Sequence, residues 1–386
     1  MDALMLPLNW QRVRLGGIGK PCMCKRVMKH QTTRYGEIPF YKIGTFGNTA
    51  DAFISKKLFL EYKTKYSFPK KGDILISASG TIGRAVIYDG KPAYFQDSNI
   101  VWVDNDETLV KNDFLFYAYS NVKWNTEHTT ILRLYNDNFR NTLIPLPPLN
   151  EQSAIANILS GLDRYLYALD ALILKKESVK KALSFELLSQ RKRLKGFNQA
   201  WQRVRLGDIA NYLTSNLSAE QITQQGKIKV YDVNNFIGYT DTTFISDKPY
   251  ISIVKDGSVG RVRILPPKTN ILSTMGALIA NHRTTTEFLF YLLSNFDFKN
   301  FTSGSIIPHI YFKDYKEKTI FLPPLNEQSA IANILSTLDN EIASLKNKKR
   351  QFENIKKALN HDLMSAKIRV LKKISFTTKI KPKNAF

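Results

Sequence analysis

The sequence predicts an α+β fold built as an internal duplication, in which two mixed α/β domains are separated by two long helices that form an antiparallel coiled coil. The duplication is visible directly. The segment WQRVRLG occurs at residues 10–16 and again at 201–207, and PPLNEQSAIANILS occurs at 147–160 and again at 323–336. Long identical segments in the same order indicate a repeated structural unit. The two halves are therefore expected to share one fold, related by a pseudo-two-fold repeat.

The interiors of the two repeats have diverged. The first motif recurs at an offset of 191 residues and the second at 176, so the first interior is 15 residues longer. Weaker matches survive inside, with GTIGR at 80–84 against GSVGR at 257–261, and FLFY at 114–117 against 288–291. This pattern predicts one fold that carries two different surfaces.

Each Pro-Pro motif leads into a stripe of apolar residues whose spacing alternates between four and three. A mean spacing of 3.5 is the seam of a coiled coil. The alternative is that each stripe packs into its own domain, but two nearly identical stripes favour pairing with each other. Asn150 and Asn326 suit the cap position and Glu151 and Glu327 the positive helix start. The seam residues are Ile155, Leu159, Leu162, Leu166, Leu169, Ile331, Leu335, Leu338, Ile342 and Leu345.

Lysines interrupt the seam in its middle, since Lys349 stands where Ile173 sits and Lys176 where Phe352 sits. Outside the helices, short β-rich runs broken by glycines predict mixed sheets with a short aromatic-rich helix in each half. The expected organisation is a first domain at 1–149, a central helix at 150–196, a second domain at 197–325, a C-terminal helix at 326–370 and a basic tail at 371–386.

The charge balance favours a polyanionic partner. The chain has 56 Lys+Arg against 33 Asp+Glu, a net charge of +23. Nucleic acid is the first partner that such an excess suggests, although a merely basic cytosolic protein would show it too. Cys22 and Cys24 are too few for a disulfide framework and are expected to be structural rather than metal ligands. No apolar stretch reaches the ~20 residues of a membrane span, so a cytoplasmic protein is expected.

The duplicated basic chain, with PLPPLNEQ and FLPPLNEQ each leading into a long helix, resembles the specificity (S) subunits of type I restriction-modification systems. The resemblance implies target recognition domains at about 10–147 and 201–322, each reading one half of a bipartite, asymmetric site in double-stranded DNA. It also implies that the helices set the spacing and dock methyltransferase (M) subunits, two of them, with restriction (R) subunits as further partners. S-adenosylmethionine, ATP and Mg²⁺ are then expected on those partners and no cofactor in this chain.

Side chains that could contact DNA are cations, hydroxyls and histidines near the glycine turns and before the second Pro-Pro motif. In the first half the lysines and Arg84 are expected to cluster around the turn at 80–83. In the second half Gly304, Ser305 and Pro308 match a Gly-Ser/Thr-x-x-Pro loop of the family, which the first half lacks. The candidates are Lys63, Lys65, Lys70, Arg84, His128, Arg133, Arg261, Arg263, Ser303, Ser305, His309 and Lys313, and the expected partner-docking residues are Glu151, Gln152, Glu327 and Gln328.

Catalytic motifs are missing from the sequence. It has no GxxxxGK[ST] phosphate loop, no Asn/Asp-Pro-Pro-aromatic methyl-acceptor clamp, and no His-Glu-x-x-His or Cys-x-x-Cys metal site. A non-catalytic subunit is therefore expected. Two alternatives stay open: a fused restriction enzyme whose nuclease site uses Asp51, Glu61 and Lys63, and a coiled-coil scaffold whose basic surface is incidental.

Overall fold

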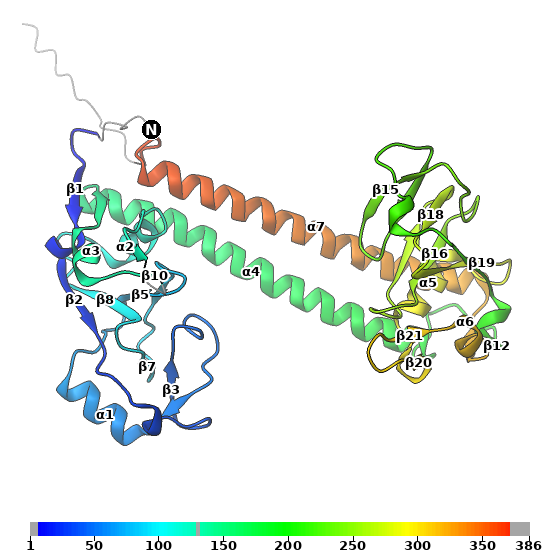
Figure 1. The fold of residues 1–386 in the computed structure, drawn as a ribbon, viewed down its shortest axis with the longest axis horizontal. Helices are drawn as coiled ribbons and strands as arrows, with labels where there is room; N and C mark the ends of the chain where they lie inside the picture. Colours follow the sequence, from blue (N-terminus) through cyan, green and yellow to red (C-terminus); the bar gives the residue numbers. More distant parts are fainter. Residues whose placement is uncertain (1–6, 129–131, 371–386) are drawn as a thin grey trace, which may run out of the picture. The chain divides into compact units, whose positions relative to one another are not determined.

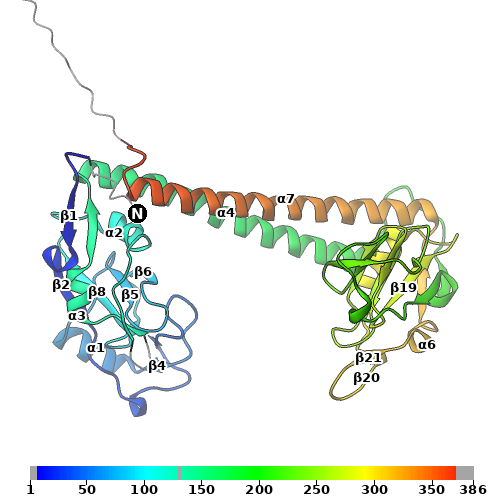
Figure 2. The same cartoon turned by 45° about the horizontal axis from the view of Figure 1, so that its top comes forward.

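The computed structural model describes residues 7–128 and 132–370, with the side chains of 127, 128 and 132 left out. The chain divides into two compact units. Unit 1 consists of residues 1–168 and 349–386, and unit 2 of residues 169–348. Each unit holds one mixed domain together with parts of both long helices (Figures 1 and 2). The predicted basic tail at 371–386 lies outside the described residues.

The mixed domain of unit 1 contains two main sheets. The larger sheet has the strand order β2 (Gly19–Met23), β8 (Ile100–Asn105), β5 (Ile74–Ser77) and β6 (Ala85–Ile87). The smaller sheet has the order β4 (Phe53–Ile54), β3 (Ile38–Tyr41) and β7 (Tyr94–Phe95). Two-stranded ribbons are formed by β1 (Gln11–Arg14) with β11 (Leu143–Leu146), and by β9 (Glu127–His128) with β10 (Leu132–Arg133). The short helices are α1 (Lys56–Lys65), α2 (Asn112–Tyr119) and α3 (Asn136–Asn141).

Unit 2 repeats this topology. Its four-stranded sheet has the order β13 (Ala210–Thr214), β19 (Met275–Ala280), β16 (Tyr250–Val254) and β17 (Val262–Leu265). Its three-stranded sheet has the order β15 (Phe236–Thr240), β14 (Ile228–Tyr231) and β18 (Thr269–Ile271). The ribbons are β12 (Gln202–Arg205) with β22 (Thr319–Leu322), and β20 (Thr302–Ser303) with β21 (His309–Ile310). The short helices are α5 (Thr286–Ser294) and α6 (Phe312–Tyr315), and 3-10 turns lie at Leu15–Gly17, Lys29–Gln31, Leu206–Asp208, Ala219–Gln221 and Lys299–Phe301.

Helix α1 explains most of the length difference between the repeats. Strands β3 and β14 begin 190 residues apart. The carbonyl of Ser77 accepts a hydrogen bond from the N–H of Gly83, and the carbonyl of Val254 accepts the equivalent bond from Gly260. Ser77 and Val254 are 177 residues apart. The extra residues of unit 1 therefore lie between these points, where α1 follows β4. The described residues between β15 and β16 form no helix.

The central strands are buried on both faces, which is why they read as continuous apolar runs rather than alternating ones. In β5, Ile74 and Ile76 face the cluster that contains α2, while Leu75 faces the cluster that contains α1 and the small sheet. In β16, Ile251 and Ile253 face the α5 cluster and Tyr250 faces the other side. The period of two along each strand thus places the large sheet between two apolar layers.

The two long helices are α4 (Leu149–Leu188) and α7 (Leu325–Met364), and they lie side by side within each unit (Figure 1). All ten predicted seam residues are buried or half-buried, and among them Ile155 and Leu159 belong to the core of unit 1 and Ile331 and Leu335 to the core of unit 2. The pairs Lys176–Glu341 and Lys180–Asp339 of unit 2 show the antiparallel direction, since one number rises as the other falls. In unit 1 the rings of Tyr165 and Phe352 pack with centroids 4.7 Å apart.

The glycine turn between β5 and β6 fits closely beneath an aromatic ring. Gly80 and Gly83 both have positive φ, at 65° and 84°. A Cβ at Gly83 would come within 2.2 Å of Nε1 of Trp124, whereas a Cβ at Gly80 would meet nothing within 4 Å. Unit 2 repeats the close approach, because a Cβ at Gly260 would lie 2.5 Å from Phe298.

We expect Gly83→Ala to destabilise unit 1 more than Gly80→Ala. Both variants force alanine into the left-handed region, at a cost of about 1–2 kcal/mol. Only Gly83→Ala must also displace Trp124, and overpacking of this kind adds about 1–3 kcal/mol. Urea unfolding of the two variants measures the difference, and equal stability would contradict the packing explanation.

Candidate nucleic-acid interface

A tyrosine, an aspartate and a lysine join the mixed domain of unit 1 to both long helices. The hydroxyl of Tyr117 on α2 donates to Oδ2 of Asp163 on α4 at 2.7 Å. Lys356 of α7 donates to the same carboxylate, and its ammonium lies 5.7 Å from the centroid of the Tyr117 ring. Burial raises the pKa of Tyr117 and the bond to Asp163 raises it further, so the phenol remains a hydrogen-bond donor.

Unit 2 contains the same arrangement. The hydroxyl of Tyr291 on α5 donates to Asp339 of α7 at 2.9 Å, and Lys180 of α4 donates to Asp339 at 2.5 Å. In each unit the tyrosine comes from the mixed domain, the aspartate from the helix that follows that domain, and the lysine from the other long helix. The two arrangements therefore exchange the roles of α4 and α7.

A second contact between the mixed domain and the long helices uses a buried glutamate at the start of each long helix. In unit 1, Trp10 donates to Glu151 at 3.1 Å, and Arg369 binds the same carboxylate through two bonds of 2.6 and 2.8 Å. In unit 2, Trp201 donates to Glu327 at 2.9 Å, and Arg193 binds it at 2.6 and 3.2 Å. Each arginine follows the end of the other long helix. A two-bond arginine–carboxylate contact is among the stronger polar contacts in proteins.

The glutamines next to these glutamates also bond within their own unit. Gln152 accepts from the backbone N–H of Lys111 at 2.8 Å and donates to the Pro147 carbonyl at 2.8 Å. Gln328 donates to the Pro323 carbonyl at 2.8 Å and accepts from Thr284 at 2.9 Å.

The partner-docking assignment of these four residues therefore needs correction. Gln152, Glu327 and Gln328 are fully buried, and Glu151 is 2% exposed. A side chain whose polar atoms are enclosed and bonded inside its own unit presents no surface to a partner.

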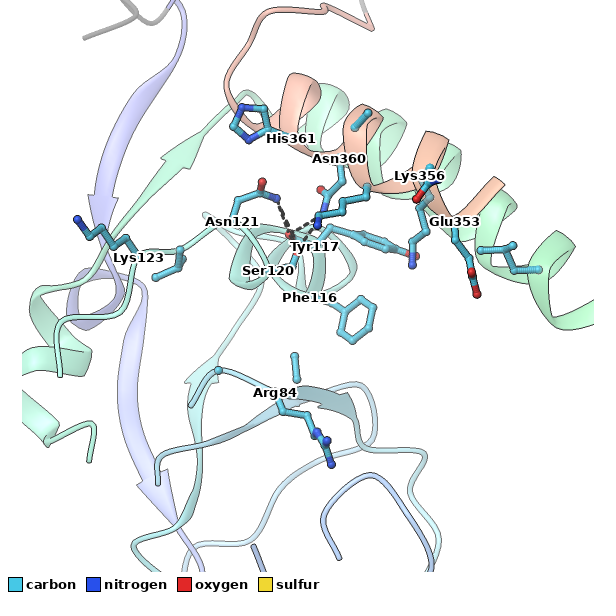
Figure 3. A pocket seen from close by; sticks show the side chains of 17 residues that line it. Arg84, Phe116, Tyr117, Ser120, Asn121, Lys123, Glu353, Lys356, Asn360 and His361 are labelled. Carbon is cyan, nitrogen blue, oxygen red and sulfur yellow. Dashed lines mark hydrogen bonds between the residues drawn. The ribbon is translucent and has the colours of Figure 1, made fainter. Parts of the chain in front are cut away.

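Where α2 meets α7 in unit 1, the surface forms a groove of about 1310 Å³ (Figure 3). Four cationic side chains line it against one acid, Glu353, and they are Arg84, Lys123, Lys356 and Lys357. The corresponding hollow of unit 2, of about 400 Å³, has Lys180, Lys181 and Lys346 together with the acids Glu177 and Asp339. The excess of cations in the groove of unit 1 suits a phosphate backbone.

Arg84 and Arg133 flank the glycine turn of unit 1. Arg133 pairs with Ser79 through an isolated β-bridge, and Arg84 donates to the Phe46 carbonyl at 2.9 Å. His128 belongs to β9, but its side chain lies outside the part of the chain that the structure describes.

The expected cluster of lysines around this turn is not formed. Lys70 lies before the other end of β5, where it pairs with Asp104 at 3.0 Å, and a four-residue strand is about 13 Å long. Lys63 lies on α1, with its ammonium 5.6 and 5.4 Å from the rings of Phe59 and Phe68. Lys65 of the same helix pairs with Glu61 at 3.1 Å. The lysines and the turn are neighbours in sequence but not in space.

In unit 2 the glycine turn and the β20–β21 hairpin form one surface. His309 pairs with Asp256 through an isolated bridge and through its Nδ1, at 2.7 Å from Oδ1, and Gly257 N–H donates to the Pro308 carbonyl at 2.9 Å. Ser303 and Ser305 are exposed on this hairpin.

The remaining cations of unit 2 contact neighbouring residues. Arg261 and Arg263 both donate to Asn234, each at 2.9 Å. Lys313 is exposed, with its ammonium 5.5 Å from the Tyr311 ring.

The family model for the type I restriction modification DNA specificity domain matches residues 7–177 and residues 198–354. Together the two matches span most of the chain, one for each repeat. The chain belongs to this family. It is accordingly a type I specificity subunit, as the resemblance of its Pro-Pro motifs and helices indicated.

Relatives and a solved structure agree with this assignment. A Haemophilus influenzae protein, named among type I restriction enzyme specificity subunits, is 62% identical over 148 residues, which cover 38% of this chain and 38% of that relative. The MjaVIII specificity subunit of Methanocaldococcus jannaschii is 26% identical over 96% of this chain and 95% of its own. The S subunit structure from M. genitalium has a TM-score of 0.62 at 20% identity, covering 93% of this chain and 98% of that one, and so shows the shared fold.

The polar contacts between the mixed domains and the long helices of this specificity subunit were not predicted from the sequence, although the repeat offset signalled them. Asp163 and Asp339, Lys180 and Lys356, and Arg193 and Arg369 all differ by 176 positions, the offset of the second motif. The hairpins were missed for another reason. β9–β10 and β20–β21 both follow the aromatic helix and both bridge to the glycine turn, but their loop sequences share no motif.

We expect Arg193→Leu to destabilise unit 2 more than an exposed ion pair would when broken, because it leaves the buried carboxylate of Glu327 without its counter-charge. Arg205→Leu is the matched control, since its pair with Glu317 is exposed on both sides and is worth at most about 1 kcal/mol. Chemical unfolding measures both. The double variant Arg193→Leu/Glu327→Gln should recover much of the loss, and no recovery would mean that lost packing rather than charge explains the effect.

Proposed function

We propose that each mixed domain of this specificity subunit reads one half of a bipartite DNA site through the loops around its glycine turn. The observation that carries the proposal is that one framework presents two different sets of side chains at the same place. In unit 1 the turn bridges to Arg133 through Ser79, and in unit 2 it bridges to His309 through Asp256. Different side chains on one framework would read different bases, so the two half-sites differ and the site is asymmetric.

The cations support binding to the DNA backbone. The net charge of +23 favours a polyanion. Arg84, Lys123 and Lys357 in the groove of unit 1 are placed to contact phosphates, which position a protein on the duplex without reading sequence. Binding should therefore weaken steeply as salt rises, and DNA binding that does not respond to salt would favour the scaffold alternative.

The methyltransferase subunits, two of them, would dock on the long helices. α4 exposes apolar side chains outside the seam, among them Leu172, Leu174 and Val179, at 39%, 64% and 41%. Exposed apolar side chains on a helix are typical of a surface that another protein covers. The same assembly would include restriction subunits, and S-adenosylmethionine, ATP and Mg²⁺ would bind to those partners.

No helix among the described residues is long and apolar enough to cross a membrane. We propose a cytoplasmic location, as expected for a subunit of this assembly.

This subunit would have no catalytic activity of its own. The three residues of the nuclease alternative have separate partners: Asp51 pairs with Lys42 at 2.7 Å, Glu61 with Lys65, and Lys63 with two aromatic rings. Within the described residues, no three His, Cys, Asp or Glu side chains are grouped where they could hold one metal ion. Magnesium-dependent cleavage by the purified chain, lost on Asp51→Ala, would revive the alternative.

Replacing residues 10–147 by the corresponding segment of another specificity subunit should change one half-site and leave the other unchanged. The reason is that each unit has its own core and its own turn and hairpin. The measurement is methylome sequencing of cells that express the chimera with a cognate methyltransferase subunit. A change in both half-sites, or a continuous motif from the unaltered chain, would refute the modular reading.

Adding seven residues after Ala168 of α4 and seven before Lys349 of α7 should lengthen the spacer by at least one base pair and preserve both half-sites. A full heptad keeps the seam in register and adds about 10 Å of helix. Methylome sequencing again gives the motif. The control inserts the heptad in α4 alone, which shifts one helix against the other and should abolish methylation. Unchanged spacing in the paired variant would show that the helices do not set it.

A further inference from the structure

The β20–β21 hairpin exposes two adjacent isoleucines at its tip. Ile306 is 93% exposed and Ile307 is 55% exposed. Single exposed apolar residues are common on protein surfaces. Two in a row at the tip of a short loop are different, because such loops are ordinarily built from polar residues, glycine and proline.

The tip is held firmly by contacts behind it. Pro308 accepts from the N–H of Gly257, and Ile310 donates its N–H to Lys255, both at 2.9 Å. His309 is bonded to Asp256. Gly304 has a φ of 90°, and a Cβ there would lie 2.3 Å from the Ile307 carbonyl, so only glycine fits this turn. The apolar tip is thus presented in a fixed position before any partner arrives.

The side chains around the tip indicate what it meets. Ser303 and Ser305 expose hydroxyls beside it, the His309 ring stacks near Tyr311, and Lys313 is exposed nearby. An apolar tip of two side chains is small for a protein interface, which typically buries about 800 Å² on each partner. A small apolar contact surrounded by hydroxyls and cations fits a base edge that carries a methyl group, with phosphates beyond it.

We propose that this hairpin enters the major groove of the half-site read by unit 2, where Ile306 contacts the 5-methyl group of a thymine. The proposal rests on the function proposed above and names one residue that determines specificity within it. A two-stranded β-ribbon fits the major groove, which is about 12 Å wide, and not the minor groove of about 6 Å. The thymine methyl projects only into the major groove, and the serine hydroxyls can bond to neighbouring base edges.

The test replaces thymine by deoxyuridine, which removes only the methyl group. The assembled complex of the full chain with its methyltransferase subunit is measured on the duplex identified by methylome sequencing, with each thymine of that half-site replaced in turn. One replacement should weaken binding about fourfold, the factor for burying one methyl-sized group, about 0.8 kcal/mol. The variant Ile306→Ala should bind the thymine and deoxyuridine duplexes equally.

The control is Leu213→Ala, which removes another half-exposed apolar side chain of unit 2, on β13, and should keep the fourfold discrimination. Because Ile306 is almost fully exposed, its variant should unfold at the wild-type temperature. Wild-type binding that is unaffected by every replacement, or a half-site without any A·T pair, would overturn the proposal. Weaker binding of Ile306→Ala to both duplexes, with the methyl effect retained, would indicate a wedge between bases instead. The absence of a bipartite motif in the wild-type methylome is a separate result, which refutes the proposed function and this inference with it.

Discussion

The buried carboxylates of Glu151 and Glu327 are the constraint on which both units depend. A buried charge is costly unless it is paired and hydrogen-bonded. Each glutamate here is satisfied by a tryptophan that directly precedes the first strand of its own repeat and by an arginine that follows the end of the other long helix. A unit therefore reaches its stable form only when parts of both repeats are present. Asp163 and Asp339, 12 residues further along the helices and partly exposed, also bind a tyrosine of the mixed domain and a lysine of the other long helix. Duplication has thus produced two units that each contain parts of both repeats.

The features that the sequence predicts well are those with a periodic or repeated signal. The seam at Ile155, Leu159 and their counterparts is visible because burial along a helix pair imposes a spacing of 3.5. The contacts of Lys356 and Arg369 were not predicted, because both are single letters in a lysine-rich stretch, and their offset of 176 from Lys180 and Arg193 was the signal that was overlooked. The lysine cluster around the first glycine turn was predicted wrongly for a related reason. Closeness in sequence says little here, because Lys70 precedes β5 and Arg84 follows the turn after it, so that the length of the strand separates them. The insertion that contains α1 was visible as a length difference, but its position was not.

The separation of framework and loops explains how one fold can hold two specificities. The bonds that stabilise each unit lie where the mixed domain meets the helices, and nearly the same residues make them twice. The glycine turn and its neighbouring hairpin are joined to each other by an isolated β-bridge, between Ser79 and Arg133 in unit 1 and between Asp256 and His309 in unit 2. Gly83 and Gly260 are fixed by the rings above them, while Arg133 in one unit is replaced by His309 in the other. Packing thus dictates the residues of the framework, and leaves the bridge pair free to differ.

This freedom is greatest at the tip of the hairpin. Ile306 has almost no packing contacts within the chain, so the free energy of unfolding is nearly indifferent to which residue stands there. The turn that presents it is not indifferent, because Gly304 is required by its φ and by the close Ile307 carbonyl. A rigid turn with a freely exchangeable tip lets the base that is read change without a loss of stability. A reading residue placed in the core could not do this, since each change would alter packing as well as recognition. An isoleucine exposed to water is unfavourable in an ordinary surface loop. Its presence here is explained if the tip recognises DNA at a position that folding does not constrain.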